Sequence, residues 1–271
     1  MKKLIAMLLA LVMVLAFAAC ANDTEAPSTT TAAPATTAPV ENTEEVTEPA
    51  SDVMTYADYA AAELDAAVTV ECYVQATQGW WEKEGQGVIT VYAQDNDGGY
   101  FVYEMKCAKE DAAKLTEGTK IRVTGFKGEW SGEVEIMDAS FEFVDGADTF
   151  VAEAMDATAL LGTEELINYQ NQKVSFKGMT VAAANDEGAA YLYKWDGSGK
   201  EGDDLYFNVS LGEATYTFCV ESYLTGDGTD VYEAVQSWNV GDVVDLEGFL
   251  YWYEGAQPHI TSVEVMPTAA A

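Results

Sequence analysis

The stretch Gly118-Thr-Lys-Ile-Arg-Val-Thr-Gly125-Phe126 returns later in the chain, in altered form, as Gly241-Asp-Val-Val-Asp-Leu-Glu-Gly248-Phe249. Both glycines and the phenylalanine keep their spacing, and the residues between them alternate between apolar and polar, as in a strand with one buried face. A tryptophan follows each copy shortly after its second glycine, at Trp130 and at Trp252. The repeat indicates that the chain contains two copies of one domain, each about 100 residues long.

Apolar and polar residues also alternate elsewhere in the first copy, which predicts further strands on either side of this stretch. One of them contains Val68-Thr-Val-Glu-Cys72, whose counterpart in the second copy is Val174-Ser-Phe-Lys-Gly178. The predicted strands of the first copy cover 68–76, 87–94, 100–105, 120–126 and 133–143.

Helices are predicted at two places in each copy. In the first copy, 108–115 has helical composition and ends near a glycine, between the third and fourth strands. Thr55 and Asp58 have the spacing of a capping box, which predicts a short helix before the first strand. In the second copy, 163–171 and 230–238 occupy the same two places.

Five strands with a helix between the third and fourth follow the order of the OB-fold, a partly open Greek-key barrel. We therefore predict a mainly β protein with two tandem OB-fold-like five-stranded barrels (βββαββ), each preceded by a short helix. The predicted domains are a signal peptide at 1–19, a lipid anchor and tether at 20–50, OB-like domains at 51–147 and 148–267, and a disordered tail at 268–271.

The N-terminal segment has the features of an export signal. Lys2 and Lys3 precede an uncharged, mostly aliphatic run of 16 residues that ends in Phe17-Ala-Ala-Cys20. This run is shorter than the roughly 20 residues that a transmembrane helix needs. The cysteine after two small residues resembles the lipobox of bacterial lipoproteins, although the family usually has Leu where this chain has Phe17. The resemblance implies lipidation at Cys20 on the outer face of the cytoplasmic membrane, and simple secretion is the alternative.

Composition bounds what the rest of the chain does. Residues 21–50 are mainly Thr, Ala, Pro and Glu, which cannot bury enough apolar surface to fold, so this segment is expected to be a flexible tether. The whole chain has 13 basic and 46 acidic residues and a net charge of −33. Such a field repels a phosphate backbone, and we expect no nucleic acid among the partners. The acidic surface is either merely solvated or attracts divalent or cationic partners.

A family resemblance extends over nearly everything after the tether. The chain resembles the tandem OB-fold lipoproteins of Gram-positive gut-type bacteria, for which the resemblance implies a fold and a location but no established reaction. It departs from the family pattern at Cys72, where the second copy also has glycine. The segments that carry the resemblance are Met54-Thr-Tyr-Ala-Asp-Tyr-Ala60, Val74-Gln-Ala76, Thr119-Lys-Ile-Arg-Val-Thr-Gly-Phe126, Glu129-Trp-Ser-Gly-Glu-Val-Glu-Ile136 and Gln172-Lys-Val-Ser-Phe-Lys-Gly-Met-Thr-Val181.

Aromatic residues in the first copy fall where OB-folds bind ligands, on strands two and three and the loops beside them. The loops contain Trp80, Trp81 and Trp130, and strand alternation directs three tyrosines outward, which are Tyr73, Tyr92 and Tyr100. Flat aromatic rings beside carboxylates and amides suit stacking on sugar rings or peptides. The alternative is that the tryptophans cap a barrel end or pack against the other copy. The second copy offers Tyr251, Trp252 and Tyr253, together with Trp195.

Other chemistry is sparsely represented. Besides Cys20, the cysteines are Cys72, Cys107 and Cys219, which form at most one disulfide and which we expect to be free thiols, with Cys72 facing inward. No Walker, CxxC or GxSxG motif occurs. His259 is the only histidine, so a histidine-based triad or metal centre lacks parts, and we expect it to be structural. We assign no catalytic residue and no metal ligand.

Two acidic loops are predicted to be turns. The stretch 95–99, Asp-Asn-Asp-Gly-Gly, lies between two strands, and 196–204 departs from the EF-hand pattern. Ca²⁺ binding is the alternative for both, and no other cofactor is expected. The sequence thus predicts a non-catalytic surface module that binds a glycan, peptide or wall component. A structural lipoprotein that contacts an envelope protein and a carboxylate-based hydrolase are the alternatives.

Overall fold

The computed structural model describes residues 53–266, which belong to one compact unit. The predicted signal peptide, the predicted lipidation site Cys20, the whole of the predicted tether and the predicted tail at 268–271 lie outside the described residues. Within residues 53–266 no helix is both long and apolar enough to cross a membrane.

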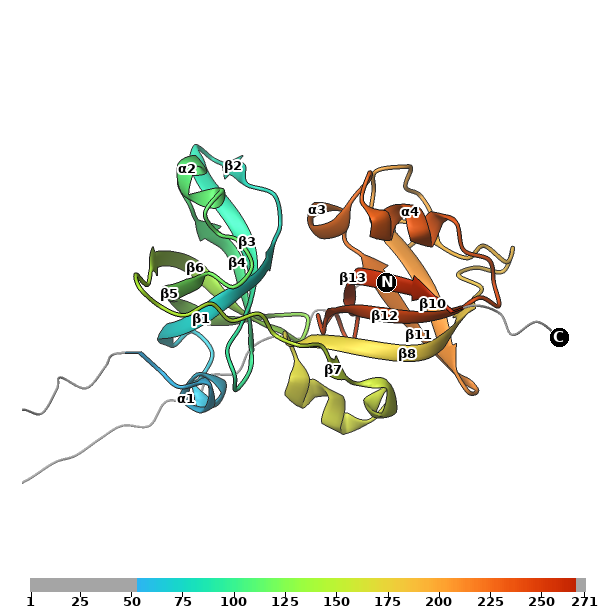
Figure 1. The fold of residues 1–271 in the computed structure, drawn as a ribbon, viewed down its shortest axis with the longest axis horizontal. Coiled ribbons are helices and arrows are strands. Elements are labelled where there is room, and N and C mark those ends of the chain that lie inside the picture. The colour runs from blue at the N-terminus through green and yellow to red at the C-terminus, as the bar shows by residue number, and fades with distance from the viewer. Residues whose placement is uncertain (1–52, 267–271) are drawn as a thin grey trace, which may run out of the picture. The chain divides into compact units, whose positions relative to one another are not determined.

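The first barrel is a ring of five strands. These are β1 (Ala67–Thr77), β3 (Gln86–Gln94), β4 (Gly99–Lys106), β5 (Lys120–Trp130) and β6 (Glu133–Phe143). The ring runs β1-β5-β6-β4-β3 and closes because β3 also pairs with β1. Only β4 and β6 are parallel, and the other pairs are antiparallel (Figure 1). A short strand, β2 (Trp81–Lys83), extends the sheet beside β3.

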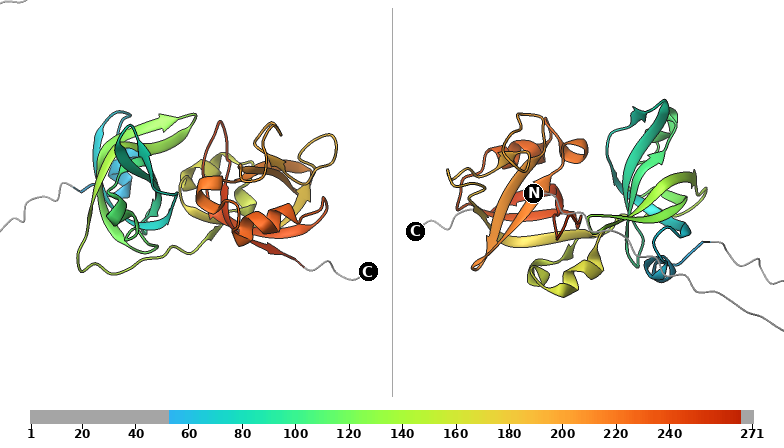
Figure 2. Two further views of the ribbon diagram at one scale, coloured as in Figure 1. Left: turned by 90° about the horizontal axis from the view of Figure 1, so that it is seen from above. Right: turned by 180° about the vertical axis from the view of Figure 1, so that it is seen from behind.

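The second barrel repeats this ring strand for strand. Its members are β8 (Lys173–Ala182), β10 (Leu205–Leu211), β11 (Ala214–Val220), β12 (Val243–Phe249) and β13 (His259–Val265). The β8–β10 pairing closes it, and β11 and β13 are the parallel pair. Figure 2 shows this barrel, in yellow to red, from two further sides. Two short strands, β7 (Met155–Asp156) and β9 (Leu192–Tyr193), extend this sheet. The prediction of a mainly β protein with two tandem OB-like barrels is confirmed.

The helices lie where the repeat places them. Helix α1 (Tyr56–Ala61) begins with the predicted capping box between Thr55 and Asp58, and α2 (Lys109–Ala112) lies between β4 and β5. In the second copy α3 (Ser222–Thr225) and α4 (Asp230–Gln236) fill the corresponding position. Before β8 the chain forms two 3₁₀ helices, η1 (Thr158–Leu160) and η2 (Glu164–Tyr169), where the first copy has an α-helix.

The repeated glycine of each fourth strand is explained by a close approach between strands. A Cβ atom on Gly125 would lie 2.7 Å from the carbonyl oxygen of Met137, and one on Gly248 would lie 2.0 Å from that of His259. In both barrels the pairing register shifts at this glycine. A residue with a side chain does not fit there. The glycine is therefore repeated because the fourth and fifth strands of each barrel approach each other closely at this position.

The departure at Cys72 reflects a difference in backbone geometry. Strand β1 runs through Cys72 in regular register, and the thiol is fully buried in the barrel as predicted. At the matching position β8 has a bulge, where Gly178 adopts φ +62° and donates its N–H to Asp245 Oδ1 at 2.7 Å. The positive φ favours glycine in the second copy only.

Each barrel has its own apolar core, and a third cluster joins them. The three cysteines of residues 53–266 are free and buried, as expected. Tyr92, Phe101 and Phe249 form the joining cluster, with Leu224 and Tyr251 packed against it. Because these residues come from both barrels, the cluster is an interface within the unit that contains them.

Candidate functional site

The face of the first barrel that corresponds to the ligand face of other OB-folds is covered by the second barrel. Tyr92 and Phe101 are direct partners in the β3–β4 pair, so both project to the same side of the sheet. Phe249 stacks on Tyr92 with ring centroids 4.7 Å apart, and His259 Nδ1 lies 2.8 Å from Tyr92 Oη. In other OB-folds the second and third strands of the barrel bind ligands. Here these strands are β3 and β4, and the contacts above place them inside the interface.

This arrangement corrects the predicted exposure of two tyrosines. Tyr92 points away from its own barrel core as predicted, but it is only 1% exposed because the second barrel covers it. Tyr100 points the opposite way, into the core of the first barrel. Its strand partner is Ala93, which lies in the same core, and directly paired residues project to the same side of a sheet. Its hydroxyl donates to Asp95 Oδ2 at 2.8 Å. Neither ring is open to solvent.

The other predicted aromatic residues of the first copy are dispersed. Trp80 donates its indole N–H to the carbonyl oxygen of Cys107 at 3.0 Å, and Lys109 lies over its ring. Tyr73 packs against Phe150 and lies under Lys120. Trp81 is 45% exposed on the edge strand β2. The predicted cluster of three tryptophans and three tyrosines therefore does not form.

Instead, the tips of the two β-hairpins that contain the repeated tryptophans meet each other. The rings of Trp130 and Tyr253 lie 5.2 Å apart, and the Glu254 N–H donates to the Ser131 carbonyl oxygen at 2.7 Å. Glu133 is fully buried, and its Oε2 atom accepts a 2.8 Å bond from the Trp252 N–H. Burial raises the pKa of the Glu133 carboxyl to about 8. Trp130 belongs to the first barrel but packs against Tyr253 of the second, away from the other tryptophans predicted in the first copy.

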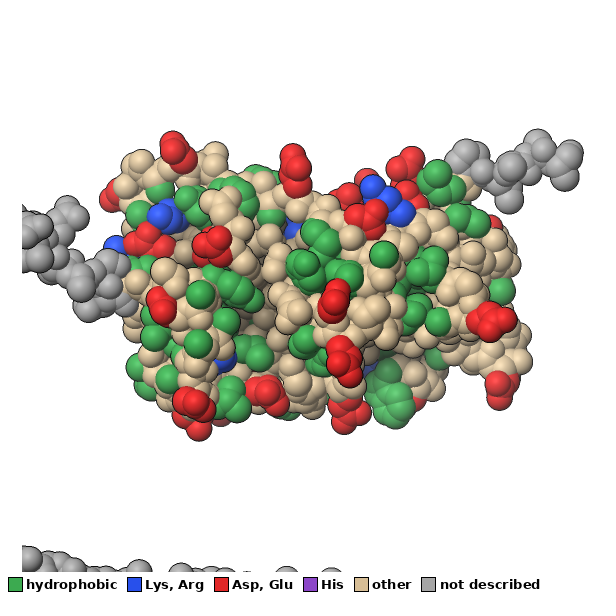
Figure 3. Space-filling view, turned by 90° about the horizontal axis from the view of Figure 1, so that it is seen from below, with side chains coloured by type: hydrophobic (Ala, Val, Ile, Leu, Met, Phe, Trp, Pro, Cys, Tyr) green, Lys and Arg blue, Asp and Glu red, His purple; other side chains and the backbone are tan. Residues whose placement is uncertain are grey.

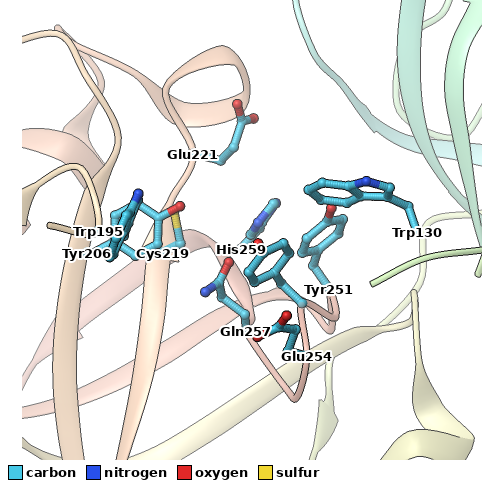
Figure 4. A pocket seen from close by; sticks show the side chains of 10 residues that line it. Trp130, Trp195, Tyr206, Cys219, Glu221, Tyr251, Glu254, Gln257 and His259 are labelled. Carbon is cyan, nitrogen blue, oxygen red and sulfur yellow. The ribbon is translucent and has the colours of Figure 1, made fainter. Parts of the chain in front are cut away.

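A pocket of about 550 Å³ lies beside this contact. It occupies the ligand position of an OB-fold in the second barrel, between the loop before β10, the strands β10 and β11, and the loop before β13. Figure 4 shows Trp195 and Tyr206 on one side of the central space and Tyr251 and Trp130 on the other. The lining residues are Trp130, Trp195, Tyr206, Cys219, Glu221, Tyr251, Tyr253, Glu254, Gln257 and His259.

The tryptophans of the pocket are open to solvent. Trp195 is 75% exposed and Trp130 is 56% exposed, and Tyr253 is also exposed. His259 is buried at the floor, stacked on Tyr251 with ring centroids 4.1 Å apart. Burial lowers the pKa of His259 to about 3, so its imidazole is neutral at physiological pH. The histidine holds neighbouring rings in place, in agreement with the structural role predicted for it.

Two carboxyl groups complete the lining. Glu221 is nearly buried and accepts bonds from Gln78 Nε2 at 3.1 Å and from the Tyr223 N–H at 3.2 Å. Desolvation raises the pKa of the Glu221 carboxyl to about 7. Glu254 is exposed on the opposite rim. No Lys or Arg lines the pocket, and carboxylates greatly outnumber basic side chains on the molecular face in Figure 3.

Sequence reasoning named four of the ten residues that line this pocket, counting Trp195, which it mentioned beside the predicted site residues. Trp130, Tyr251 and Tyr253 were predicted site residues, whereas Trp252 lies against Gly132 on another surface. Tyr206, Glu221 and Gln257 were not predicted. Strand alternation in 205–211 could have identified Tyr206 as outward facing, but Glu221 and Gln257 lie in loops without a periodic signal.

The acidic loops form backbone turns. Asp95 Oδ1 accepts the N–H groups of Asp97 and Gly98, both at 2.8 Å. Asp196 Oδ1 accepts the N–H and the hydroxyl of Ser198, at 3.0 Å and 2.6 Å. Within residues 53–266 no group of three or more His, Cys, Asp or Glu is arranged to hold a metal ion.

No protein-family model and no curated protein matches the chain. Similar solved structures include the p204 HINb domain, with 13% identity and a TM-score of 0.32, covering 72% of this chain and 95% of that one. A murine DNA-binding protein bound with double-stranded DNA has 14% identity and a TM-score of 0.36, covering 75% and 97%. A replication protein A heterotrimer bound to single-stranded DNA has 12% identity and a TM-score of 0.32, covering 75% and 49%. These likenesses concern the fold alone.

One expectation from the sequence is corrected by these comparisons. Net charge led us to exclude nucleic acid from the partners, yet the similar structures include domains bound to double-stranded and single-stranded DNA. The predicted exclusion of nucleic acid is therefore wrong and is not retained.

Proposed function

We propose that this protein is a lipid-anchored module of the outer cell surface that binds a saccharide or peptide of the cell envelope without altering it chemically. The anchor is Cys20, and residues 21–50 are the tether that separates the binding unit from the membrane. The finer family assignment, to the tandem OB-fold lipoproteins, is part of this proposal.

The observation that carries the proposal is the open aromatic pocket of the second barrel. Exposed tryptophans in a soluble protein lose favourable burial, so a cluster of them around a pocket indicates a surface that is covered when a ligand binds. Trp195 and Trp130 offer flat apolar faces, and Gln257 and Glu254 offer an amide and a carboxylate for hydrogen bonds. Flat faces with a few polar groups suit the rings of sugars and the side chains of peptides.

The pocket also combines both copies of the repeat. Trp130 is the last residue of β5 in the first barrel, and the other nine lining residues come from the second. The first barrel's own ligand face is buried in the interface. The tandem therefore presents one composite site, and we propose that this is the reason both copies are present.

A binding screen on the full chain tests this proposal, with glycan, peptide and oligonucleotide arrays as parallel arms. We expect a glycan or peptide signal that falls at least tenfold in Trp195→Ala and in Trp130→Ala. Trp81→Ala is the matched control, because Trp81 is also exposed but lies outside the pocket. A signal from oligonucleotides alone, or one that Trp81→Ala removes and Trp195→Ala leaves intact, would contradict the proposal.

A further inference from the structure

The pocket brings aromatic rings and carboxyl groups together without a basic side chain. Five aromatic residues besides His259 line it, which are Trp130, Trp195, Tyr206, Tyr251 and Tyr253. Glu221 and Glu254 stand at opposite ends of the view in Figure 4. We infer that the pocket recognises an organic ammonium group on its ligand, an inference that rests on the proposed binding function of this same site.

The aromatic rings favour a cation over a neutral group of equal size. The face of a tryptophan or tyrosine ring carries negative partial charge, and an ammonium group within about 6 Å of the ring centre is attracted to it. Trp130 and Tyr253 are close enough, at 5.2 Å between ring centroids with a 45° tilt, to contact one bound group together. Trp195 lies on the opposite side of the pocket and offers an exposed ring to the same ligand.

The carboxyl groups of the pocket have no cation of their own. The ion pairs formed among residues 53–266 include neither Glu221 nor Glu254. The basic residue nearest in sequence to the pocket tryptophans is Lys194, beside Trp195, and it pairs with Asp203 at 3.7 Å. A positively charged ligand would meet the exposed Glu254 carboxylate and the Glu221 carboxyl, neither of which takes part in those ion pairs, and the net charge of −33 would attract it from a distance.

A pair of probes that differ only in charge tests the inference. Choline and 3,3-dimethyl-1-butanol have the same shape, but a neutral carbon replaces the quaternary nitrogen in the second. Titration of the full chain, followed by tryptophan fluorescence, should give an affinity for choline at least about fivefold higher than for the neutral probe, because one exposed cation–π contact contributes about two- to fivefold and the Glu254 carboxylate adds to it. In Glu254→Gln the ratio of the affinities for choline and the neutral probe should fall at least threefold. Glu213→Gln, an exposed change in a distant turn, is the control.

The outcomes separate this inference from the proposed function. Equal affinities for the two probes, both lowered by Trp195→Ala, would overturn the ammonium inference and leave the binding pocket standing. Absence of choline binding at millimolar concentration, with or without an array signal, would also overturn it. Lysine-containing peptides and glucosamine oligomers, each compared with its N-acetylated form, then distinguish a peptide source of the ammonium group from a saccharide source.

Discussion

Tyr92 Oη of the first barrel and His259 Nδ1 of the second lie 2.8 Å apart, and both side chains are buried. The bond forms at the centre of an interface in which Phe249 stacks on Tyr92 and Tyr251 stacks on His259. His259 thus contacts the first barrel through Tyr92 and also lines the pocket together with Tyr251. The contact that holds the barrels together is continuous with the floor of the candidate site.

Removal of the Tyr92 hydroxyl should weaken this contact. Tyr92→Phe keeps the ring and leaves His259 Nδ1 buried without a partner, so we expect the free energy of unfolding to fall by about 1–2 kcal/mol. Chemical denaturation at pH 7 measures this change. Tyr223→Phe is the control, because Tyr223 is 74% exposed. Equal stabilities of the two variants would contradict the interface described.

Stability should depend on pH through Glu133. Burial raises the pKa of this carboxyl from 4.5 to about 8, so between these pH values the folded state keeps a proton that the unfolded state has released. The contribution of Glu133 is therefore complete below pH 4.5 and is lost as pH rises towards 8, by at most about 1.4 kcal/mol per pH unit. Denaturation of Glu133→Gln should show a smaller loss of stability from pH 5 to pH 8 than the parent chain. Glu213→Gln should follow the parent, and a Glu133→Gln profile parallel to the parent's would refute the assignment.

His259 contributes in the opposite direction. Burial lowers its pKa from 6.5 to about 3, so between these pH values the imidazole is protonated in the unfolded state and neutral in the folded state. Its contribution is present above pH 6.5 and is lost as pH falls towards 3. We expect an NMR titration of the single imidazole to show no protonation in the folded chain between pH 7 and pH 5. A midpoint near 6.5 would mean that His259 is open to water.

Lys127 should anchor helix α1 to the first barrel. Its ammonium group donates to the carbonyl oxygens of Tyr59, Ala60 and Ala62, at 3.1, 2.8 and 2.8 Å, where the helix ends. Lys127→Met keeps the length of the side chain and removes these bonds, so we expect a loss of about 2 kcal/mol in unfolding free energy. Lys177→Met, at an exposed position, should change stability by less than about 0.5 kcal/mol. Similar losses in both variants would contradict the anchoring role.

Local patterns sufficed to predict the fold. The fifth strand of the first copy was predicted at 133–143 and forms as β6 at Glu133–Phe143, and the capping box at Thr55 begins α1. These features depend on residues close in sequence, where alternation and capping chemistry act directly. The repeated glycines predicted the second barrel from the first. In both barrels the fourth and fifth strands approach so closely at this position that a Cβ atom would clash with a backbone carbonyl oxygen.

The site depended on what single strands do not specify. The face on which Tyr100 lies follows from its pairing with Ala93, a register that alternation within one strand does not fix. Tyr92 was assigned the correct side of its sheet, but the packing of the second copy against that side has no local signal. Trp195 lies in the irregular segment between β9 and β10, where no periodicity indicates the direction of its side chain.

The central claim is that ligands bind in the pocket formed by the second barrel and Trp130. The most direct measurement is a two-dimensional ¹H–¹⁵N spectrum of the six tryptophan indole groups, recorded while choline or a glucosamine oligomer is added to the full chain. We predict that the Trp130 and Trp195 signals shift together with one affinity, while those of Trp80, Trp81 and Trp238 stay in place. Shifts confined to Trp80 or Trp81, or no shift of any indole signal with either probe, would contradict the claim.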